Sequence, residues 1–298
     1  MTDKGIVIRG HGKSFTVRCR GKDIPCEIRG RLKYGTASIT PVAVGDDVEI
    51  SLGADGAGMI EKVAERRSMF FRPAKTSDTK RQVIAANISQ LGIIVSSKNP
   101  PLKSGLVDRF LIAADMGNLK PIIIVNKIDL GRPKTASELE RGYQNIDVPI
   151  LFVSAETGES FDELKKILRG HRTIFAGHSG VGKSTILNRL IPGLNIKVSE
   201  VSKYSDKGVH TTSTIEMFEL PGGGFVVDSP GLKILRLWEL KKEDLPYYYK
   251  EMEEYLNLCR FTGCSHIHEP DCAVKAAVDK GLIPKFRYQN YVTIYNSL

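Results

Sequence analysis

The feature that most restricts the fold is a glycine-rich segment at residues 177–185, which reads GHSGVGKST. It follows the short apolar segment 172–176 (RTIFA), expected to be a strand, and precedes residues 186–190, which have helical spacing. The pattern GxxxxGK(S/T) between a strand and a helix is typical of a phosphate-binding loop, because its glycines and the helix N-terminus turn N–H groups toward an anion. The sequence therefore predicts an α/β domain that binds a phosphorylated ligand.

Two side chains of this loop have specific expected roles. Lys183 is expected to neutralise charge on the β- and γ-phosphates, and the Ser184 hydroxyl is expected to bind Mg²⁺. The full set expected around the phosphates is Gly177, His178, Ser179, Gly180, Val181, Gly182, Lys183, Ser184 and Thr185. A glycine-rich turn that arose by chance is the alternative, and the flanking strand and helix argue against it.

The segment Asn126-Lys127-Ile128-Asp129 indicates which base is bound, since it follows the apolar segment 121–125 (PIIIV) at the end where open α/β sheets bind ligands. An aspartate there can accept hydrogen bonds from N1–H and the N2 amino group of guanine, a donor pair that adenine lacks. Asn126 can contact the N7 and O6 edge, and Lys127 can lay its stem over the ring. The sequence predicts guanine specificity, with a plain surface loop as the alternative.

Two further segments complete the expected nucleotide site. Ser154-Ala155 follows the apolar segment 149–153 (PILFV), and its backbone N–H can reach guanine O6. Asp228-Ser229-Pro230-Gly231 fits the pattern DxxG, in which the aspartate holds Mg²⁺ through water and the Gly231 N–H contacts the γ-phosphate. Residues 208–212 (GVHTT) are expected to be a switch, with Thr212 completing the Mg²⁺ shell.

These motifs stand in an unusual order, because 126–129 and 154–155 precede the phosphate loop whereas ordinary GTPases place them after it. The chain resembles a circularly permuted GTPase and is similar in particular to the RsgA/YjeQ family of small-ribosomal-subunit biogenesis GTPases. A permuted chain can fold because domain termini usually lie close together. The expected helix 160–168, with Ser160 at its N-cap and Glu163 completing a capping box, would then join the strand 172–176.

The resemblance implies an enzyme that hydrolyses GTP to GDP and phosphate in late maturation of the small (30S) ribosomal subunit. Leu232 stands where many GTPases have a water-orienting glutamine, so slow intrinsic turnover is expected, with a partner completing the site. In the family, the small subunit stimulates hydrolysis and the histidine matching His210 is the proposed catalytic residue. A structural or solvent-exposed His210 is the alternative.

A cluster of cysteine and histidine near the C-terminus predicts a metal site. Cys259, Cys264, His266 and Cys272 offer three thiolates and one imidazole, which satisfy the closed tetrahedral shell of a structural zinc ion. Their spacing also matches the zinc module of the family. His268 is the rival histidine, and the family pattern favours His266.

The rest of the chain predicts two flanking domains. Short β-forming segments at 6–9, 14–18, 24–31 and 47–50, separated by glycine-rich turns, favour a small OB-like β-barrel over residues 1–68. Residues 69–81 lose this pattern and are expected to be a linker, 82–235 the permuted GTPase domain, and 236–298 a helical zinc-binding domain. Helices are expected at 242–258, 273–280 and 284–298.

Charge and composition suggest partners and location. Residues 1–81 hold 16 basic and 10 acidic side chains, against 27 and 24 in residues 82–298, which favours a polyanion partner such as ribosomal RNA.

Five cysteines without a disulfide pattern, and no apolar run that could be a signal or span a bilayer, favour a cytoplasmic protein without membrane contact. We expect a monomer that binds GTP, GDP and the small subunit. The alternatives are an RNA-binding assembly scaffold that holds GTP without needing hydrolysis, and an ATPase or metabolite kinase.

Overall fold

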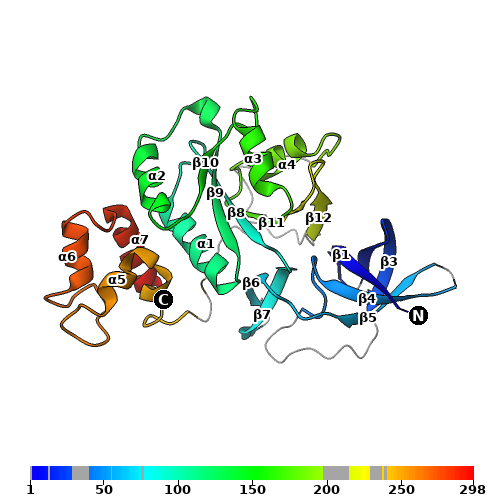
Figure 1. Ribbon diagram of the computed structural model, residues 1–298, viewed down its shortest axis with the longest axis horizontal. Coiled ribbons are helices and arrows are strands. Elements are labelled where there is room, and N and C mark those ends of the chain that lie inside the picture. The colour runs from blue at the N-terminus through cyan, green and yellow to red at the C-terminus, as the bar shows by residue number, and fades with distance from the viewer. Residues whose placement is uncertain are drawn as a thin grey trace, which may run out of the picture.

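Figure 1 shows the computed structural model, an elongated molecule with a barrel at one end and a helical module at the other. It describes residues 2–12, 14–28, 40–54, 56–74, 77–196, 215–228, 237 and 240–298. Between the two ends lies a sheet that carries helices on both faces. Among the described residues, no helix is both long enough and apolar enough to cross a membrane.

The N-terminal part is a closed five-stranded barrel. Its strands are β1 (Asp3–His11), β2 (Ser14–Cys19), β3 (Lys22–Ile28), β4 (Asp47–Leu52) and β5 (Gly58–Val63). They pair in the order β1-β2-β3-β5-β4, and β4 returns to β1, which closes the barrel as in OB-like folds. Apolar side chains alternate inward along the strands, and Val7, Val17 and Ile60 are fully buried in the barrel core. The predicted barrel is confirmed, although the sequence analysis had missed β5.

A hairpin follows the barrel, in the region where the sequence predicts a linker over residues 69–81. Strands β6 (Met69–Ala74) and β7 (Ser77–Ala86) pair with each other in an antiparallel two-stranded sheet. The segment that leaves the barrel is therefore a paired hairpin. Pro73 does not prevent the pairing, because a two-stranded sheet has only edge strands, on which a proline can face away from its neighbour.

The central part is a sheet covered on both faces. Its strands are β8 (Gln90–Ser96), β9 (Lys120–Asn126), β10 (Ile150–Phe152), β11 (Arg172–Ala176), β12 (Ile215–Glu219) and β13 (Phe225–Asp228), in the order β10-β9-β8-β11-β13-β12. All neighbours are parallel except β12, which runs antiparallel to β13. Continuous apolar runs such as β8 are buried on both sides, as expected for strands in the middle of such a layered fold.

Two pairs of helices cover the opposite faces of this sheet (Figure 1). One face packs against α1 (Ser104–Met116) and α2 (Ala136–Gln144), and the other against α3 (Phe161–Leu168) and α4 (Lys183–Leu190). Helix α3 begins where it was expected, but Ser160 has a left-handed backbone (φ 60°) and its side chain makes no capping hydrogen bond. The predicted capping box is therefore wrong, because an N-cap side chain needs an extended backbone to reach back to the helix.

The barrel and the central sheet are joined edge to edge. Strand β1 pairs antiparallel with β12, with Arg9 opposite Glu216 and Gly10 opposite Ile215, so the sheet runs on into the barrel. Arg9 forms an ion pair with Glu216, and Arg18 of the barrel donates to Glu219 at 3.0 Å. The barrel therefore sits at a fixed place beside the edge strand of the central sheet.

The C-terminal part is helical but more broken than expected. It contains η2 (Leu245–Tyr248), η3 (Lys250–Met252), α5 (Glu253–Leu256), α6 (Ala273–Asp279) and α7 (Lys285–Ser297). The single helix predicted over 242–258 is wrong, because the backbone leaves the helical region at Tyr249 (φ −108°, ψ 85°). There the Tyr249 ring packs edge-on against Tyr291 of α7, with centroids 5.3 Å apart. Tyr291 also lies against the Tyr288 and Tyr295 rings of the same helix, so this face of α7 is a packing surface.

A buried ionic cluster ties α7 to the central domain. The Arg287 guanidinium is 2% exposed, pairs with the Asp108 carboxylate of α1, and donates to Glu251 at 2.6 Å. Its positive charge also lies over the Tyr143 and Tyr249 rings, 5.4 and 4.6 Å from their centroids. The two carboxylates hold the pKa of Arg287 well above its usual value despite burial, so the cation persists in the interior.

Candidate functional site

The carboxyl ends of the parallel strands bring the expected nucleotide motifs to one edge of the central sheet. Asn126 is the last residue of β9 and pairs with Ser96 at the end of β8, while Asp228 ends β13 opposite Phe175 of β11. The glycine-rich loop leaves the end of β11, which lies between β8 and β13. This is the edge at which open parallel sheets bind ligands.

Asn126 links the guanine motif to the phosphate loop. Its side chain is buried, and Nδ2 donates to the Val181 carbonyl oxygen at 2.9 Å while Oδ1 accepts from the Ala155 N–H at 3.0 Å. The loop must approach closely for this contact: a Cβ on Gly182, whose φ is 94°, would lie 2.3 Å from Nδ2. One side chain thus joins three of the expected motifs.

Lys127 forms a second link between the same segments. It has a left-handed backbone (φ 64°), and its ammonium group donates to the Gly180 carbonyl oxygen and to the Asn99 carbonyl oxygen, each at 2.5 Å. Burial lowers the pKa of Lys127, and the nearby Asp129 carboxylate opposes that shift. The aliphatic stem therefore spans the space between the base motif and the phosphate loop.

Asp129 and Ser154 are also brought together. The Ser154 hydroxyl donates to Asp129 Oδ1 at 2.6 Å and accepts from the Thr157 N–H at 3.1 Å. Ser154 is buried. The Ile128 N–H donates to the Val153 carbonyl oxygen at 3.3 Å, which holds the segment 126–129 beside the segment that contains Ser154. The carboxylate that is expected to read guanine therefore has a defined position.

The glycine-rich loop has the backbone that the motif requires. Gly180 and Gly182 have φ values of 81° and 94°, and a Cβ on Gly177 would lie 2.1 Å from the Ile94 carbonyl oxygen of β8. His178 and Ser179 are exposed, while Ser184 and Thr185 lie in the first turn of α4. The loop can therefore present N–H groups to an anion at the start of a helix.

Lys183 binds back to the first residues of the glycine-rich loop. Its ammonium group donates to the carbonyl oxygens of Gly177 at 2.8 Å and His178 at 3.0 Å. Burial lowers the pKa of Lys183, while the Asp228 carboxylate opposes the shift. The lysine of the phosphate loop and the aspartate of the DxxG pattern are thus electrostatic neighbours.

Three predicted residues of the site, His210, Thr212 and Gly231, lie outside the described residues, as do Ser229, Pro230 and Leu232. Their places as catalytic, Mg²⁺-binding and γ-phosphate-binding residues stay predictions. Asp228 is the last described residue before Gly231.

Sequence reasoning missed one residue that organises the site. Arg189 of α4 donates to the carbonyl oxygens of Ala155 and Glu156 at 3.0 Å and of Thr157 at 2.9 Å. Gly158 leaves room for the guanidinium, since a Cβ there would lie 2.1 Å from it. The only available signal was an arginine in the helix after the phosphate loop, which carries no information about a turn more than thirty residues earlier.

The expected metal ligands converge in the C-terminal part. One donor atom from each of Cys259, Cys264, His266 and Cys272 lies within 4.8 Å of all the others. His266 Nδ1 is 3.5 Å from Cys259 Sγ and 3.4 Å from Cys272 Sγ, and the two sulfurs are 3.9 Å apart. A tetrahedral zinc ion with Zn–S bonds of ~2.3 Å and a Zn–N bond of ~2.0 Å needs ligand atoms about 3.5–3.8 Å apart. The donor set therefore fits zinc in type and in spacing.

The loop around these ligands is held by its own hydrogen bonds. The Glu269 carboxylate accepts from Ser265 N–H at 2.8 Å, Ile267 N–H at 3.3 Å and His268 N–H at 3.2 Å, and these contacts lower its pKa to about 2 against the burial that raises it. Tyr288 donates to the His266 carbonyl oxygen at 2.8 Å. The rival ligand His268 is exposed and stands outside the cluster.

Comparisons with known proteins agree with this arrangement. Residues 63–238 match the family model described as RsgA GTPase, and residues 4–60 match the one described as RsgA N-terminal domain. The chain is 40% identical to the small ribosomal subunit biogenesis GTPase RsgA of Chlorobaculum parvum, over 100% of this chain and 98% of that protein. It is 36% identical to the protein of the same name from Bacteroides fragilis, over 98% of this chain and 96% of that protein.

Two solved structures are similar over the full chain. The crystal structure of YjeQ from Thermotoga maritima has a TM-score of 0.81 and 33% sequence identity, covering 100% of this chain and 99% of that one. The structure of YloQ, described as a circularly permuted GTPase, has a TM-score of 0.75 and 28% identity, covering 100% and 95%. The reversed motif order and the three-part architecture are thus shared with solved relatives.

Proposed function

The chain belongs to the RsgA family of GTPases, and we propose that it binds GTP with Mg²⁺ and hydrolyses it to GDP and phosphate in late maturation of the small (30S) ribosomal subunit. The observation that carries this proposal is the direct contact of Asn126 and Lys127 with carbonyl oxygens of the phosphate loop. A base held at Asp129 and phosphates held at the loop would then belong to one nucleotide.

The residues have separate roles in this proposal. Asp129 accepts hydrogen bonds from N1–H and N2 of guanine, and the Ala155 N–H lies near enough to Asn126 to serve the O6 edge. Lys183 and the N–H groups of 177–185 neutralise the β- and γ-phosphates. Ser184, Thr212 and Asp228 would hold Mg²⁺, which would supply positive charge against the negative charge that develops during phosphoryl transfer. The Gly231 N–H would contact the γ-phosphate.

Hydrolysis needs a water molecule oriented in line with the γ-phosphate. Leu232 has no polar atom for this task. We assign the orientation of the water to His210, which matches the proposed catalytic histidine of the family, and we expect slow turnover until the small subunit completes the site. Groups that a partner supplies to such sites accelerate phosphoryl transfer by roughly 10³–10⁵.

The Cys₃His cluster would hold one structural zinc ion through Cys259, Cys264, His266 and Cys272. Four protein ligands leave no open position for substrate, which favours a structural role over a catalytic one. The ion would fix the loop that α7 packs against through Tyr288.

We assign residues 1–68 to the barrel, 82–235 to the permuted GTPase domain and 236–298 to the zinc domain, with the hairpin region 69–81 as the connection. The barrel and the zinc domain would contact ribosomal RNA in the GTP-bound state. The protein would act as a monomer in the cytoplasm, since its proposed partner resides there.

Phosphate release from GTP, measured with and without purified small subunits, tests the proposal. We expect a slow basal rate that rises at least ~10²-fold with small subunits. Equal rates would favour the assembly scaffold that holds GTP without hydrolysis, and tight binding of ADP would favour an ATPase or kinase. The His210→Ala variant should retain GDP binding and lose the stimulated rate; retention of that rate would remove His210 from the mechanism.

A further inference from the structure

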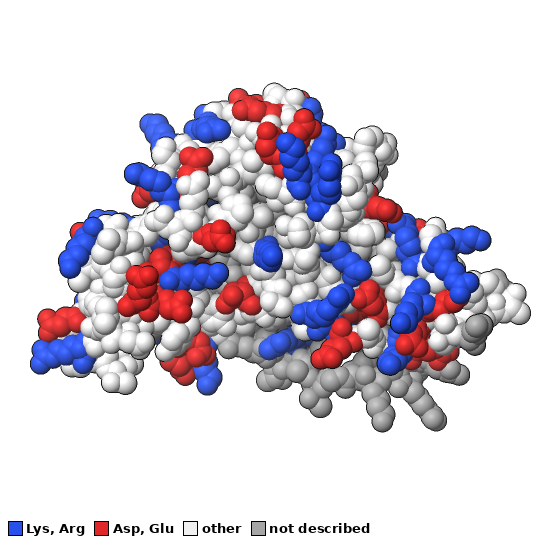
Figure 2. Space-filling view, viewed as in Figure 1, with Lys and Arg blue, Asp and Glu red and all other residues white. Residues whose placement is uncertain are grey.

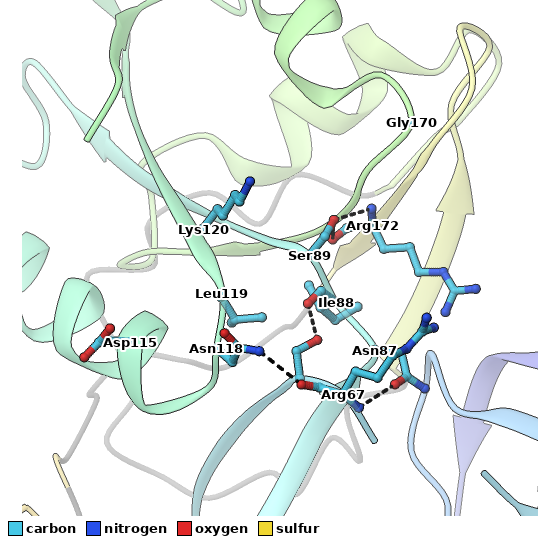
Figure 3. A pocket seen from close by; sticks show the side chains of 11 residues that line it. Arg67, Asn87, Ile88, Ser89, Asp115, Asn118, Leu119, Lys120, Gly170 and Arg172 are labelled. Carbon is cyan, nitrogen blue, oxygen red and sulfur yellow. Dashed lines mark hydrogen bonds between the residues drawn. The ribbon is translucent and has the colours of Figure 1, made fainter. Parts of the chain in front are cut away.

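A polar cavity lies at the opposite edge of the central sheet from the phosphate loop. Its volume is about 550 Å³, and Figure 3 shows its walls coming from the starts of β8, β9 and β11, the C-terminal end of α1 and the chain that leaves the barrel. In parallel strands, the starts and the carboxyl ends lie at opposite edges. A ligand here would therefore not compete with the nucleotide.

The lining has the composition of a phosphate-binding surface. Beside one acidic side chain, Asp115, the lining holds three cationic side chains, Arg67, Lys120 and Arg172, and the hydroxyl and amide groups of Ser68, Ser89, Asn87 and Asn118. These are the side chains that proteins use to contact the phosphates of nucleic acids. Among the lining residues none is aromatic, and only Ile88 and Leu119 are large and apolar.

That lining argues against a small-molecule site. Pockets for nucleosides and similar ligands are lined mainly by hydrophobic and aromatic side chains that cover the ring. Two aliphatic side chains cannot cover a base, whereas a phosphodiester chain needs only charge and hydrogen-bond donors. The cavity therefore favours a polyanion backbone over a free nucleotide.

The two arginines are held in place but remain available. Arg172 reaches Asp47 Oδ1 of β4 at 3.4 Å and Arg67 reaches Asp47 Oδ2 at 3.2 Å, so one barrel carboxylate draws both guanidinium groups to the same place. The Arg67 side chain is 75% exposed and Asp47 is 36% exposed. The Arg172 side chain is only 22% exposed, but the Arg67–Asp47 pair is largely exposed and therefore weak, so a phosphate can share or replace Asp47 at Arg67.

Lys120 adds a cation on the other wall of the cavity. It is the first residue of β9, its side chain is exposed, and no described residue accepts a hydrogen bond from its ammonium group. Figure 2 shows Lys and Arg side chains spread over the barrel and the junction between the barrel and the central sheet, with some acidic side chains among them. Cations and carboxylates are thus mixed on this face, and Lys120 adds positive charge to the cavity itself.

We propose that this cavity binds backbone phosphates of ribosomal RNA when the protein is on the small subunit, with Arg67, Lys120 and Arg172 as the phosphate-binding residues. The inference rests on the proposed function for the identity of the partner, and adds a contact surface separate from the outer faces of the barrel and the zinc domain. Since Arg67 and Arg172 meet at the barrel residue Asp47, the same RNA segment would contact both domains.

The test is the salt dependence of binding to purified small subunits, with the Arg67→Ala/Lys120→Ala double variant. Arg172 is left in place because it also donates to the Gly45 carbonyl oxygen. Each phosphate contact contributes about 0.7–0.9 to the steepness with which the log of the binding constant falls with the log of the salt concentration. The double variant should therefore show a slope about 1.5 shallower than the wild type, and it should bind small subunits about tenfold more weakly at physiological salt. GDP binding of the variant should equal that of the wild type, which also shows that it is folded.

The matched control is Lys134→Ala/Arg141→Ala, which removes two exposed cations of the same domain away from the cavity. An unchanged slope in the Arg67/Lys120 variant would overturn this inference and leave the proposed function standing. An equal fall of the slope in the control would do the same, because it would show a general effect of net charge. Failure of the wild-type protein to bind small subunits would overturn the proposed function and this inference with it.

Discussion

The Lys127 ammonium group donates a hydrogen bond to the Gly180 carbonyl oxygen at 2.5 Å, although Lys127 precedes Gly180 by 53 residues. Asn126 makes a parallel contact with the next residue of the loop, Val181. In an ordinary GTPase order the base motif would follow the phosphate loop along the chain. The contacts bring the two motifs together, whatever their order in the sequence.

Replacement of Asp129 by asparagine should abolish the preference for guanine. The amide keeps one acceptor but presents N–H groups to the N1–H and N2 donors, so two charge-assisted hydrogen bonds are lost. At about 1.5–3 kcal/mol each, GDP binding should weaken by at least ~10²-fold. Titration with GDP and with xanthosine diphosphate, whose C2 carbonyl can accept from the amide, measures the change.

The matched control for that variant is Asp162→Asn, at an aspartate on α3 whose side chain is 88% exposed. It should bind GDP as the wild type does. Equal GDP affinities for Asp129→Asn and the wild type would remove Asp129 from the base site.

Replacement of Arg189 by alanine should weaken GDP binding about tenfold without altering the phosphate loop itself. The three hydrogen bonds from its guanidinium hold the turn after Ser154, and because the residue is exposed each contributes only about 0.5 kcal/mol, at the low end for a hydrogen bond. Inorganic pyrophosphate, which makes no base contacts, should bind to the variant as it does to the wild type.

Arg169, exposed in the loop after α3, provides the comparison for Arg189. Its alanine variant should leave GDP affinity unchanged. If Arg189→Ala weakens GDP and pyrophosphate equally, the arginine acts on the fold of the domain and not on the base site.

The nucleotide motifs and the candidate metal cluster could be found in the sequence because each is local: Lys183 and Ser184 are neighbours in the chain, and the four cysteine and histidine residues span fourteen residues. Contacts between distant segments were not. Arg189 reaches 32 to 34 residues back to its carbonyl partners, and β1 pairs with β12 over about two hundred residues. Neither contact leaves a pattern in one sequence.

The errors in local structure have tertiary causes. The predicted helix over 242–258 breaks where the Tyr249 side chain is buried against Tyr291, and tertiary packing overrides helix propensity there. The hairpin β6–β7 was missed because its alternation is interrupted by register shifts at Phe70/Phe71 and Pro73/Ala74. A bulge moves side chains to the other face and hides the period of two.

Replacement of Arg287 by alanine should destabilise the protein by about 3–5 kcal/mol, because it leaves the Asp108 and Glu251 carboxylates buried without a cation. Urea unfolding followed by fluorescence measures the loss. The exposed pair Arg260–Asp271 offers a control, and Arg260→Ala should change stability by no more than ~1 kcal/mol. Equal effects of the two variants would contradict the buried cluster as a strong link between α1 and α7.

Replacement of Glu269 by alanine should speed the loss of zinc to a chelator about tenfold or more. The carboxylate, whose pKa is held at about 2, is ionised in the folded and unfolded chain at neutral pH, so its hydrogen bonds to the loop are fully present there and would be lost only as the pH falls from ~4.3 toward 2. A colorimetric zinc indicator follows the release. Glu253→Ala, at an exposed position on α5, should behave as the wild type, and equal release from both variants would contradict the role of Glu269.

Removal of zinc from the wild-type protein should loosen the C-terminal part and spare nucleotide binding. The four expected metal ligands lie in residues 259–272, whereas the contacts between the nucleotide motifs join the end of β9 to the loop after β11. After treatment with a strong chelator, limited proteolysis should cut first in that segment while GDP affinity stays within about twofold. Loss of GDP binding together with zinc would contradict the separation of the two sites.

The most direct measurement is a crystal structure of the protein with GDP bound. We expect the guanine base against the Asp129 carboxylate and the diphosphate over the N–H groups of residues 177–183, within reach of the Lys183 ammonium group. A diphosphate bound at the loop with its base turned away from Asp129, or GDP bound elsewhere on the molecule, would contradict a single nucleotide site formed by the two motifs that Lys127 and Asn126 connect.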